Sequence, residues 1–150
     1  MVTNREIVDK FYQSIALGDA ASVAELLDDD FELVIPINEG VLSGHYHGKT
    51  KFMTEVLPLV FSCVNQDEIT FCKDYKIVSD DGETSVAIAQ TSGIARTGLQ
   101  YDQVYIHVLN FCDGKLIRLI EYFDSALADR ALWGESNRLT ADKPFDLSSI

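Results

Sequence analysis

The stretch that decides the fold is Tyr101–Asp124, YDQVYIHVLNFCDGKLIRLIEYFD. Asp113-Gly114 separates two runs of alternating apolar residues, and an Asp-Gly pair in that position is typical of a β-hairpin. Successive side chains of a strand point to opposite faces, so every second residue shares one surface. One such surface carries Gln103, Tyr105, His107, Leu109, Ile117, Leu119, Glu121 and Phe123. The hairpin therefore predicts a mostly apolar face with one imidazole and one carboxyl group, as a small-molecule site requires.

Composition narrows the class of protein. The chain has 150 residues, 47% of them hydrophobic, which indicates one domain with a sizeable core. Its net charge of −12 argues against nucleic acid and anionic membrane surfaces, because both attract clustered Lys and Arg. Three cysteines without a close pairing motif favour reduced, buried thiols. The start, MVTNREIVDK, lacks an apolar signal core, and no stretch approaches the ~20 apolar residues of a membrane span, so we expect a cytoplasmic protein.

Helical signals dominate the first half of the chain. Thr3 and Glu6 fit a capping box, Gly18 fits the end of that helix, and Asp19 fits the cap of a second, short one. The inward stripe of the first helix would be Ile7, Val8, Phe11, Tyr12 and Ile15. A third helix is predicted over residues 50–64, with a kink at Pro58. Its inward side chains would be Phe52, Met53, Val56, Leu57, Val60 and Phe61.

From residue 68 onward the hydrophobic period changes to two, which indicates strands. The predicted strands cover residues 31–37, 68–78, 84–97, 100–112 and 115–123. We expect residues 28–30 to form a solvated turn and residues 40–48 a loop. Asp124 would cap a short last helix running to Trp133. The chain is thus predicted to form one domain over residues 1–133, followed by a polar tail over residues 134–150.

Helices followed by a meander of strands predict an α+β fold. We expect a curved antiparallel sheet wrapped around three N-terminal helices, which is a cone-shaped α+β barrel with an internal pocket. On the strand at 84–97 the larger side chains, including Ile88 and Gln90, should face that pocket, while Ala87 and Ala89 should face away.

The order of these elements resembles the nuclear transport factor 2-like cone fold, and most of all its SnoaL-like polyketide cyclase branch, which is related to ketosteroid isomerases. The motifs that carry the resemblance are Gly18-Asp19, Tyr46-His47-Gly48, Gly114-Lys115 and Glu121-Tyr122-Phe123-Asp124. The resemblance covers residues 3–133 in pattern and implies a homodimer through the sheet. Members include isomerases, cyclases, hydrolases, dehydratases and non-catalytic domains, so the fold alone licenses no reaction.

Position by position, this chain departs from two enzyme groups of that superfamily. Ketosteroid isomerases carry an aspartate before the proline of the first strand and a tyrosine in the first helix, where this chain has Ile35 and Phe11. Limonene-epoxide hydrolase-like members carry an Asp-Arg-Asp set, where this chain has Gln90, Ile88 and Glu121. Both departures argue against those two chemistries.

The cyclase pattern fits best. It implies a histidine on the penultimate strand and an acid on the last strand, which are His107 and Glu121 here. We interpret them as a candidate acid–base pair. Tyr105 and Gln90 would polarise a ligand oxygen. The remaining candidate ligand-binding residues are Gln103, Leu119, Phe123, Ile88, Ile35 and Phe11. No cofactor is implied, because proton transfers of this kind need none.

Each candidate also has a structural interpretation. His107 is equally well explained as a hydrogen-bonded core histidine, and Glu121 as a solvated residue or the partner of an arginine. Asp124 is best explained as a helix cap. His45 and His47 suggest a metal site, but zinc needs three or four ligands and none stands nearby, which favours a solvated loop.

Three functional hypotheses follow. The leading one is an isomerase, cyclase or dehydratase that moves a proton beside the carbonyl group of a hydrophobic small molecule. The second is a non-catalytic ligand-binding module, in which His107 and Glu121 only satisfy each other. The third, compatible with either, is a dimerisation surface on the outer face of the sheet, with Leu116 and Ile120 beside Val104 and Ile106.

Overall fold

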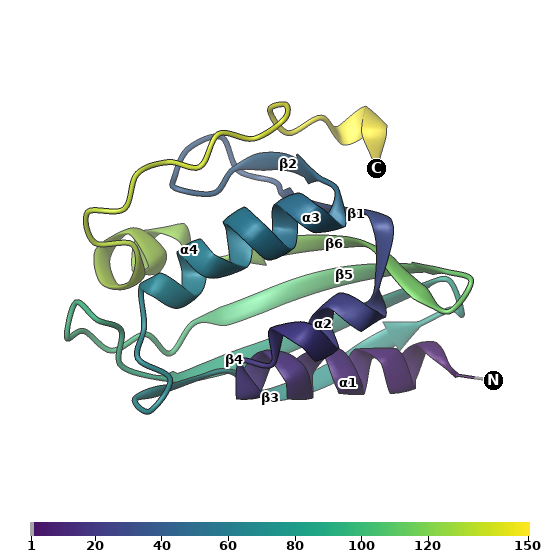
Figure 1. Ribbon diagram of the computed structural model, residues 1–150, viewed down its shortest axis with the longest axis horizontal. Helices are drawn as coiled ribbons and strands as arrows, with labels where there is room; N and C mark the ends of the chain where they lie inside the picture. The colour runs from purple at the N-terminus through teal and green to yellow at the C-terminus, as the bar shows by residue number, and fades with distance from the viewer. Residues whose placement is uncertain (1) are drawn as a thin grey trace.

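The computed structural model describes residues 2–150 and has the predicted α+β architecture. The helical segments are α1 (Asn4–Leu17), α2 (Ala20–Leu26), α3 (Lys49–Lys51), η1 (Phe52–Val56), α4 (Leu57–Ser62), α5 (Ser125–Leu127), η2 (Ala128–Leu132) and η3 (Leu147–Ser149). The strands are β1 (Leu27–Ile35), β2 (Gly44–His47), β3 (Ile69–Asp80), β4 (Thr84–Gly93), β5 (Val104–Cys112) and β6 (Lys115–Phe123). Figure 1 shows α1, α2 and the α3–α4 segment on one side of the sheet.

The strands form one sheet in the order β2-β1-β6-β5-β4-β3. All neighbours are antiparallel except β1 and β6, which are parallel, so the sheet is mixed rather than purely antiparallel. The predicted hairpin forms β5 and β6, and its register places Tyr105 opposite Phe123, His107 opposite Glu121, and Leu109 opposite Leu119. Residues directly opposite each other share a face, so His107 and Glu121 do lie on one surface.

The helix boundaries follow the capping signals in the sequence. Thr3 and Glu6 form the reciprocal capping box, and Gly18 ends α1 in the left-handed conformation with φ of 67°. Asp19 accepts a hydrogen bond from the Ser22 amide at the start of α2. The apolar stripe of α1 is buried, including Tyr12, which has no exposed surface.

The third predicted helix is interrupted at its centre. The five residues of η1 form a π-helical turn, in which the Leu57 amide donates to the Phe52 carbonyl five residues earlier. Pro58 follows directly; it has no N–H, and its ring would collide with the carbonyl of residue 54 in a regular helix. The π turn is therefore the form that the expected irregularity takes.

Several sequence predictions about the strands were wrong. Residues 28–30 belong to β1 rather than to a turn, because pairing of the buried Leu27 with Leu116 of β6 starts the strand early. Gly44–His47 is a strand instead of a loop, paired with β1. β4 ends at Gly93 rather than residue 97, and β5 begins at Val104 rather than residue 100.

The polar segment after Trp133 is not detached from the rest of the protein. It runs along β2 (Figure 1), where the His45 amide donates to the Lys143 carbonyl at 2.9 Å. The Tyr46 hydroxyl donates to the Leu139 carbonyl at 2.8 Å, and Leu139 packs against the core. This C-terminal segment therefore fixes the edge of the sheet.

Candidate functional site

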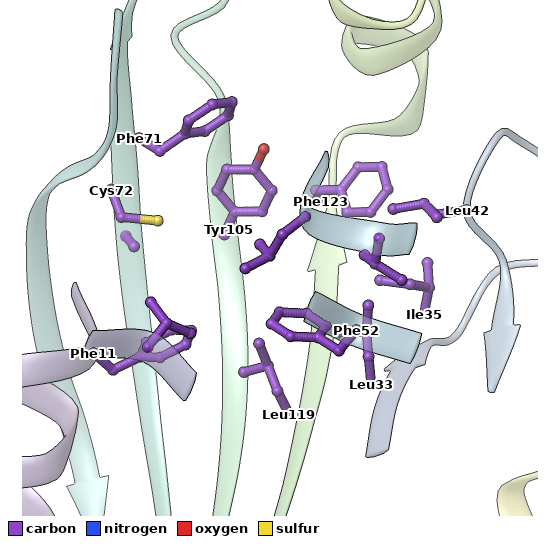
Figure 2. Close-up of a cluster of buried hydrophobic side chains, with 14 of the residues drawn as sticks. Phe11, Leu33, Ile35, Leu42, Phe52, Phe71, Cys72, Tyr105, Leu119 and Phe123 are labelled. Carbon is purple, nitrogen blue, oxygen red and sulfur yellow. The ribbon is translucent and has the colours of Figure 1, made fainter. Parts of the chain in front are cut away.

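A cavity of about 80 Å³ lies between the inner face of the sheet and the helices. Its wall is mostly aromatic and aliphatic, with side chains from α1, the η1–α4 segment, β5, β6 and the end of η2. Figure 2 shows Phe11, Phe52, Tyr105, Leu119 and Phe123 turned toward one another in this cluster. Few lining residues carry polar atoms: Glu121, His107, Tyr101, Tyr105, Cys72 and Trp133. Such a wall suits a small, largely apolar compound with one or two polar atoms.

Glu121 and His107 form a hydrogen-bonded pair on this wall. His107 Nε2 lies 3.1 Å from Glu121 Oε2, and His107 Nδ1 lies 2.8 Å from the hydroxyl of Tyr12 on α1. Burial raises the pKa of Tyr12, so its phenol stays protonated and can donate to Nδ1 when the neutral ring carries its proton on Nε2. The ring proton then resides on Nε2, where it points at Glu121. Tyr12, His107 and Glu121 thus form a chain of donors that ends on the carboxylate.

The two members of the pair differ in access. The His107 side chain is 3% exposed and both ring nitrogens have internal partners, whereas the Glu121 side chain is 22% exposed. Oε1 of Glu121 makes no hydrogen bond to any residue of the described chain. Glu121 is therefore the more accessible member of the pair, and His107 is its buried partner.

A second polar cluster lies farther along the same wall. The hydroxyls of Tyr101 and Tyr105 lie 3.0 Å apart, and both residues line the cavity. Burial raises the pKa of each phenol, so both stay protonated over the working range of most proteins. The pair adds hydrogen-bond donors to a wall that is otherwise apolar.

The structure places six predicted site residues on the cavity wall: Glu121, His107, Tyr105, Leu119, Phe123 and Phe11. Two predicted residues are buried outside it. Ile35 shares the inward face of β1 with Leu33 but comes two residues later, beyond the part of the strand that lines the cavity. Gln103 does not line the cavity, because its amide is used to hold the backbone around Asp124.

Gln90 and Ile88 were placed on the wrong face. Both are exposed on the outer side of the sheet, and Gln90 donates to the Asp102 carbonyl at 2.8 Å. Ala87 and Ala89 face inward instead, opposite His107 and Tyr105. The physical reason is space, because small side chains beside the two large rings leave room for α1 on the concave face.

A β-bulge produced a second error of parity. The register of β5 and β6 shifts after Asn110, so that Leu116 pairs with Phe111 and turns inward with no exposed surface. Ile117, expected inside, is only half-buried. A bulge adds one residue to a strand and flips every side chain before it, which the alternating pattern alone does not reveal.

Tyr12, Tyr101 and Cys72 are the residues that sequence reasoning missed or ranked low. Tyr12 was assigned to the core, yet a fully buried phenol needs a partner for its hydroxyl, and that was the available signal. Cys72 lies at a bulge of β3 with φ of 51°, and burial raises the pKa of its thiol. The three cysteines are free, as expected, but Cys112 is exposed rather than buried.

A second histidine–glutamate pair lies on β2 and β1, away from the cavity. His45 is 1% exposed, and its Nδ1 lies 3.2 Å from Oε1 of Glu32, at an angle that makes no hydrogen bond. Its Nε2 accepts the Asp146 amide at 3.1 Å, and its ring stacks on Phe145. The neighbouring His47 is exposed, and residues 2–150 contain no cluster of three metal-ligating side chains.

No protein-family model matches the chain, and no curated protein matches it in sequence. Solved structures do match. An NTF2-like protein of unknown function from Burkholderia pseudomallei is 21% identical, with a TM-score of 0.74 over 89% of this chain and 100% of that one. A Pseudomonas putida protein provisionally named a polyketide cyclase is 19% identical, with a TM-score of 0.72 over 88% and 99%.

A Bacillus subtilis protein provisionally named an isomerase is 22% identical, with a TM-score of 0.71 over 90% of this chain and 95% of that one. This chain has the nuclear transport factor 2-like fold. The neighbours span proteins of different names on that fold, so the likeness establishes architecture and leaves the reaction to be argued from the site. Within residues 2–150, no helix is both long and apolar enough to cross a membrane.

Proposed function

We propose that this protein is a cofactor-independent enzyme that moves a proton beside the carbonyl group of a small hydrophobic compound. The observation that supports the proposal most is a single accessible carboxylate, Glu121, held by His107 on the wall of an apolar cavity. Tyr105, on the same wall, supplies a hydrogen-bond donor for the carbonyl oxygen. The names of two structural neighbours, a cyclase and an isomerase, agree with this class of reaction.

In the proposed step, Oε1 of Glu121 takes a proton from the carbon next to the carbonyl group. The electron pair of that C–H bond moves to the oxygen, which accepts a hydrogen bond from Tyr105 as negative charge develops there. Returning the proton to a different carbon completes an isomerisation. In a cyclisation, the enolate carbon attacks a second carbonyl group, and the alkoxide that forms as its C=O π bond breaks takes the proton back from Glu121. His107 and Tyr12 orient the carboxylate in this step.

Exchange of deuterium into the methyl group of acetophenone in D₂O, followed by NMR, tests this proposal without knowledge of the natural substrate. We expect saturable exchange with the wild-type protein and a loss of about 10²-fold or more in Glu121→Gln. Glu32→Gln is the matched control, because Glu32 also lies beside a buried histidine and its side chain is 21% exposed. An unchanged rate in Glu121→Gln would remove that residue from the mechanism.

A non-catalytic binding module is the second candidate. It is supported by the internal partners of both His107 nitrogens, which satisfy the ring without any ligand. Acetophenone would then bind without exchange of its methyl protons, so the same experiment separates the two candidates.

We also propose that the outer face of the sheet forms a homodimer. Ile88, Ile106 and Tyr122 make a cross-strand row over β4, β5 and β6, and their exposed fractions are 43%, 46% and 52%. An apolar row of this kind favours a partner surface. Sedimentation velocity at micromolar concentration should show a dimer, and Ile106→Lys should dissociate it. The control variant Leu17→Lys changes an exposed residue of α1 and should leave the dimer intact. A wild-type monomer contradicts the proposal.

A further inference from the structure

The Tyr101–Tyr105 pair is held by a third residue, Gln103, whose amide has only one possible orientation. Its Oε1 accepts hydrogen bonds from the backbone N–H groups of Val104 and Asp124, each at 3.1 Å. Two N–H donors can face only the carbonyl end of the amide, so the NH₂ group lies on the other side. From there Nε2 donates to the Asp124 carbonyl at 2.8 Å and to the Tyr101 hydroxyl at 3.3 Å.

Counting protons shows what this arrangement leaves over. The two phenols bring two hydroxyl protons, and the bond between their oxygens uses one of them. Gln103 adds a donor to Tyr101 and accepts nothing from it. No residue of the described chain accepts the second phenol proton, and both rings lie on the cavity wall. One O–H is therefore left without an acceptor among the described residues, on a side chain that lines the cavity.

Gln103 also sets the direction of the chain. An oxygen that accepts a hydrogen bond becomes a stronger donor through its own proton, because successive bonds polarise one another. Donation from Gln103 thus favours Tyr101 as donor to Tyr105, which leaves the free proton on Tyr105. In that direction the three residues make a relay of donors that ends on Tyr105, which lines the cavity.

We infer that Gln103 is a positioning residue and that the Tyr101–Tyr105 pair selects ligands carrying a hydrogen-bond acceptor, namely a ketone or aldehyde oxygen. The inference rests on the proposed function for the choice of a carbonyl compound, but it concerns binding rather than turnover. A hydrocarbon of the same shape leaves the free O–H buried without an acceptor, and the site rejects it for that reason.

The test compares two ligands that differ in one group. Acetophenone carries the carbonyl oxygen, and ethylbenzene has CH₂ in its place. Dissociation constants for both are measured by NMR titration of the Glu121→Gln variant, in which no proton is taken from the ligand. We expect acetophenone to bind about tenfold more tightly than ethylbenzene, the ratio that one net hydrogen bond supplies.

Variants then assign the effect to the relay. Tyr105→Phe should bring the ratio close to one, and Gln103→Leu should reduce it about threefold while leaving the ethylbenzene affinity unchanged. Gln90→Leu is the matched control, because the same amide is removed from the exposed outer face of β4. Tyr101→Phe serves if Gln103→Leu does not fold, because it removes the relayed hydroxyl while Gln103 keeps its bonds to Asp124.

The carbonyl stretching frequency of bound acetophenone gives a readout that general loosening of the structure does not mimic. A hydrogen bond lowers that frequency, and Tyr105→Phe should raise it again. The inference is overturned if acetophenone does not bind, if the two ligands bind equally well, or if both Gln103→Leu and Tyr101→Phe keep the full ratio. A tenfold ratio without any proton exchange leaves this inference intact and defeats only the proposed reaction.

Discussion

Two buried histidines in this protein stand beside glutamates at almost the same distance, and they do different things. On the cavity wall, Nε2 of His107 lies 3.1 Å from Oε2 of Glu121. Near the edge of the sheet, Nδ1 of His45 lies 3.2 Å from Oε1 of Glu32. The two histidines differ in the group that is bound to their other ring nitrogen. Nδ1 of His107 forms a hydrogen bond with the Tyr12 hydroxyl, whereas Nε2 of His45 accepts a hydrogen bond from the backbone amide of Asp146.

A histidine–carboxylate contact is therefore not a functional signal by itself. What the carboxylate faces decides its use. Glu121 lines an apolar cavity, and its Oε1 makes no hydrogen bond to the described residues. Glu32 only faces the ring that clamps the C-terminal segment to β2. We propose the first pair for exchange of a proton, whereas His45 of the second pair accepts a hydrogen bond from the Asp146 amide in the C-terminal segment.

The largest effect is expected on the His45 side, at Gly44. Its φ is 99°, and a Cβ there would collide with the Lys143 carbonyl. Gly48 is the matched control, with φ of 97° and no neighbour for a Cβ. Gly48→Ala should cost about 1–3 kcal/mol of stability from backbone strain alone. Gly44→Ala should cost about 2 kcal/mol more, because the C-terminal segment must move. Urea denaturation measures both, and equal losses would mean that the segment does not hold the fold.

Replacing each histidine tests whether only His107 affects the exchange reaction. His107→Leu should lower the exchange rate of acetophenone about tenfold to a hundredfold, because Glu121 loses the partner that orients it. His45→Gln should leave that rate unchanged. The acetophenone dissociation constant, which a positioning role does not move, should stay within about twofold in both variants. A rate loss of similar size in His45→Gln would contradict the separation of the two sites.

Removal of the Tyr12 hydroxyl tests the partner that distinguishes His107. Tyr12→Phe leaves Nδ1 of His107 buried without a hydrogen bond, which should cost about 1–3 kcal/mol. Tyr75→Phe is the matched control, because that ring stacks on Tyr12 and its hydroxyl donates to Asp9 near the surface. We expect a smaller loss there in thermal or urea unfolding. Equal losses would show that Nδ1 finds another partner.

The smallest effect is expected on the way stability changes at acidic pH. The His47 amide and the Lys51 ammonium hold the pKa of Asp142 below its ordinary value of 3.8. A carboxyl with a lowered pKa contributes stability above its unfolded pKa and loses it as the pH falls through the folded value. The Asp142 side chain is 45% exposed, so this contribution is below about 1 kcal/mol. Melting temperatures of wild type and Asp142→Asn should differ at pH 6, and the difference should begin to shrink only below about pH 4, as the pH approaches the lowered folded pKa. A constant difference across that range would contradict the assignment.

Local signals in the sequence were sufficient for much of the fold. The Asp113-Gly114 turn, the capping box at Thr3 and the left-handed Gly18 all act within a few residues, and each was predicted at the right place. The hairpin also placed His107 and Glu121 on one face, because both residues belong to the same two-stranded unit. The boundaries of β1 and β2 were missed because those strands pair with segments distant in the sequence.

The candidate site was only partly accessible to the same reasoning. The pattern of β4 allowed either face to be inward, and the wrong one was chosen for Ile88 and Gln90, because the space beneath α1 decides in favour of alanine. Gln103 was expected to touch a ligand, yet its amide is consumed by backbone groups 21 residues away. Tyr12 meets His107 across 95 residues of chain, a contact that no spacing predicts.

The sequence alone determined the order of the helices and of every strand except β2, the hairpin, and the shared face of an imidazole and a carboxyl group, since these depend on capping, turn chemistry and the two-residue period of a strand. Tertiary structure alone decided which carboxylate faces a cavity, which face of β4 is inside, and which phenol holds His107. Those outcomes depend on the space and the hydrogen-bond partners that distant segments bring together, and local periodicity carries no information about either.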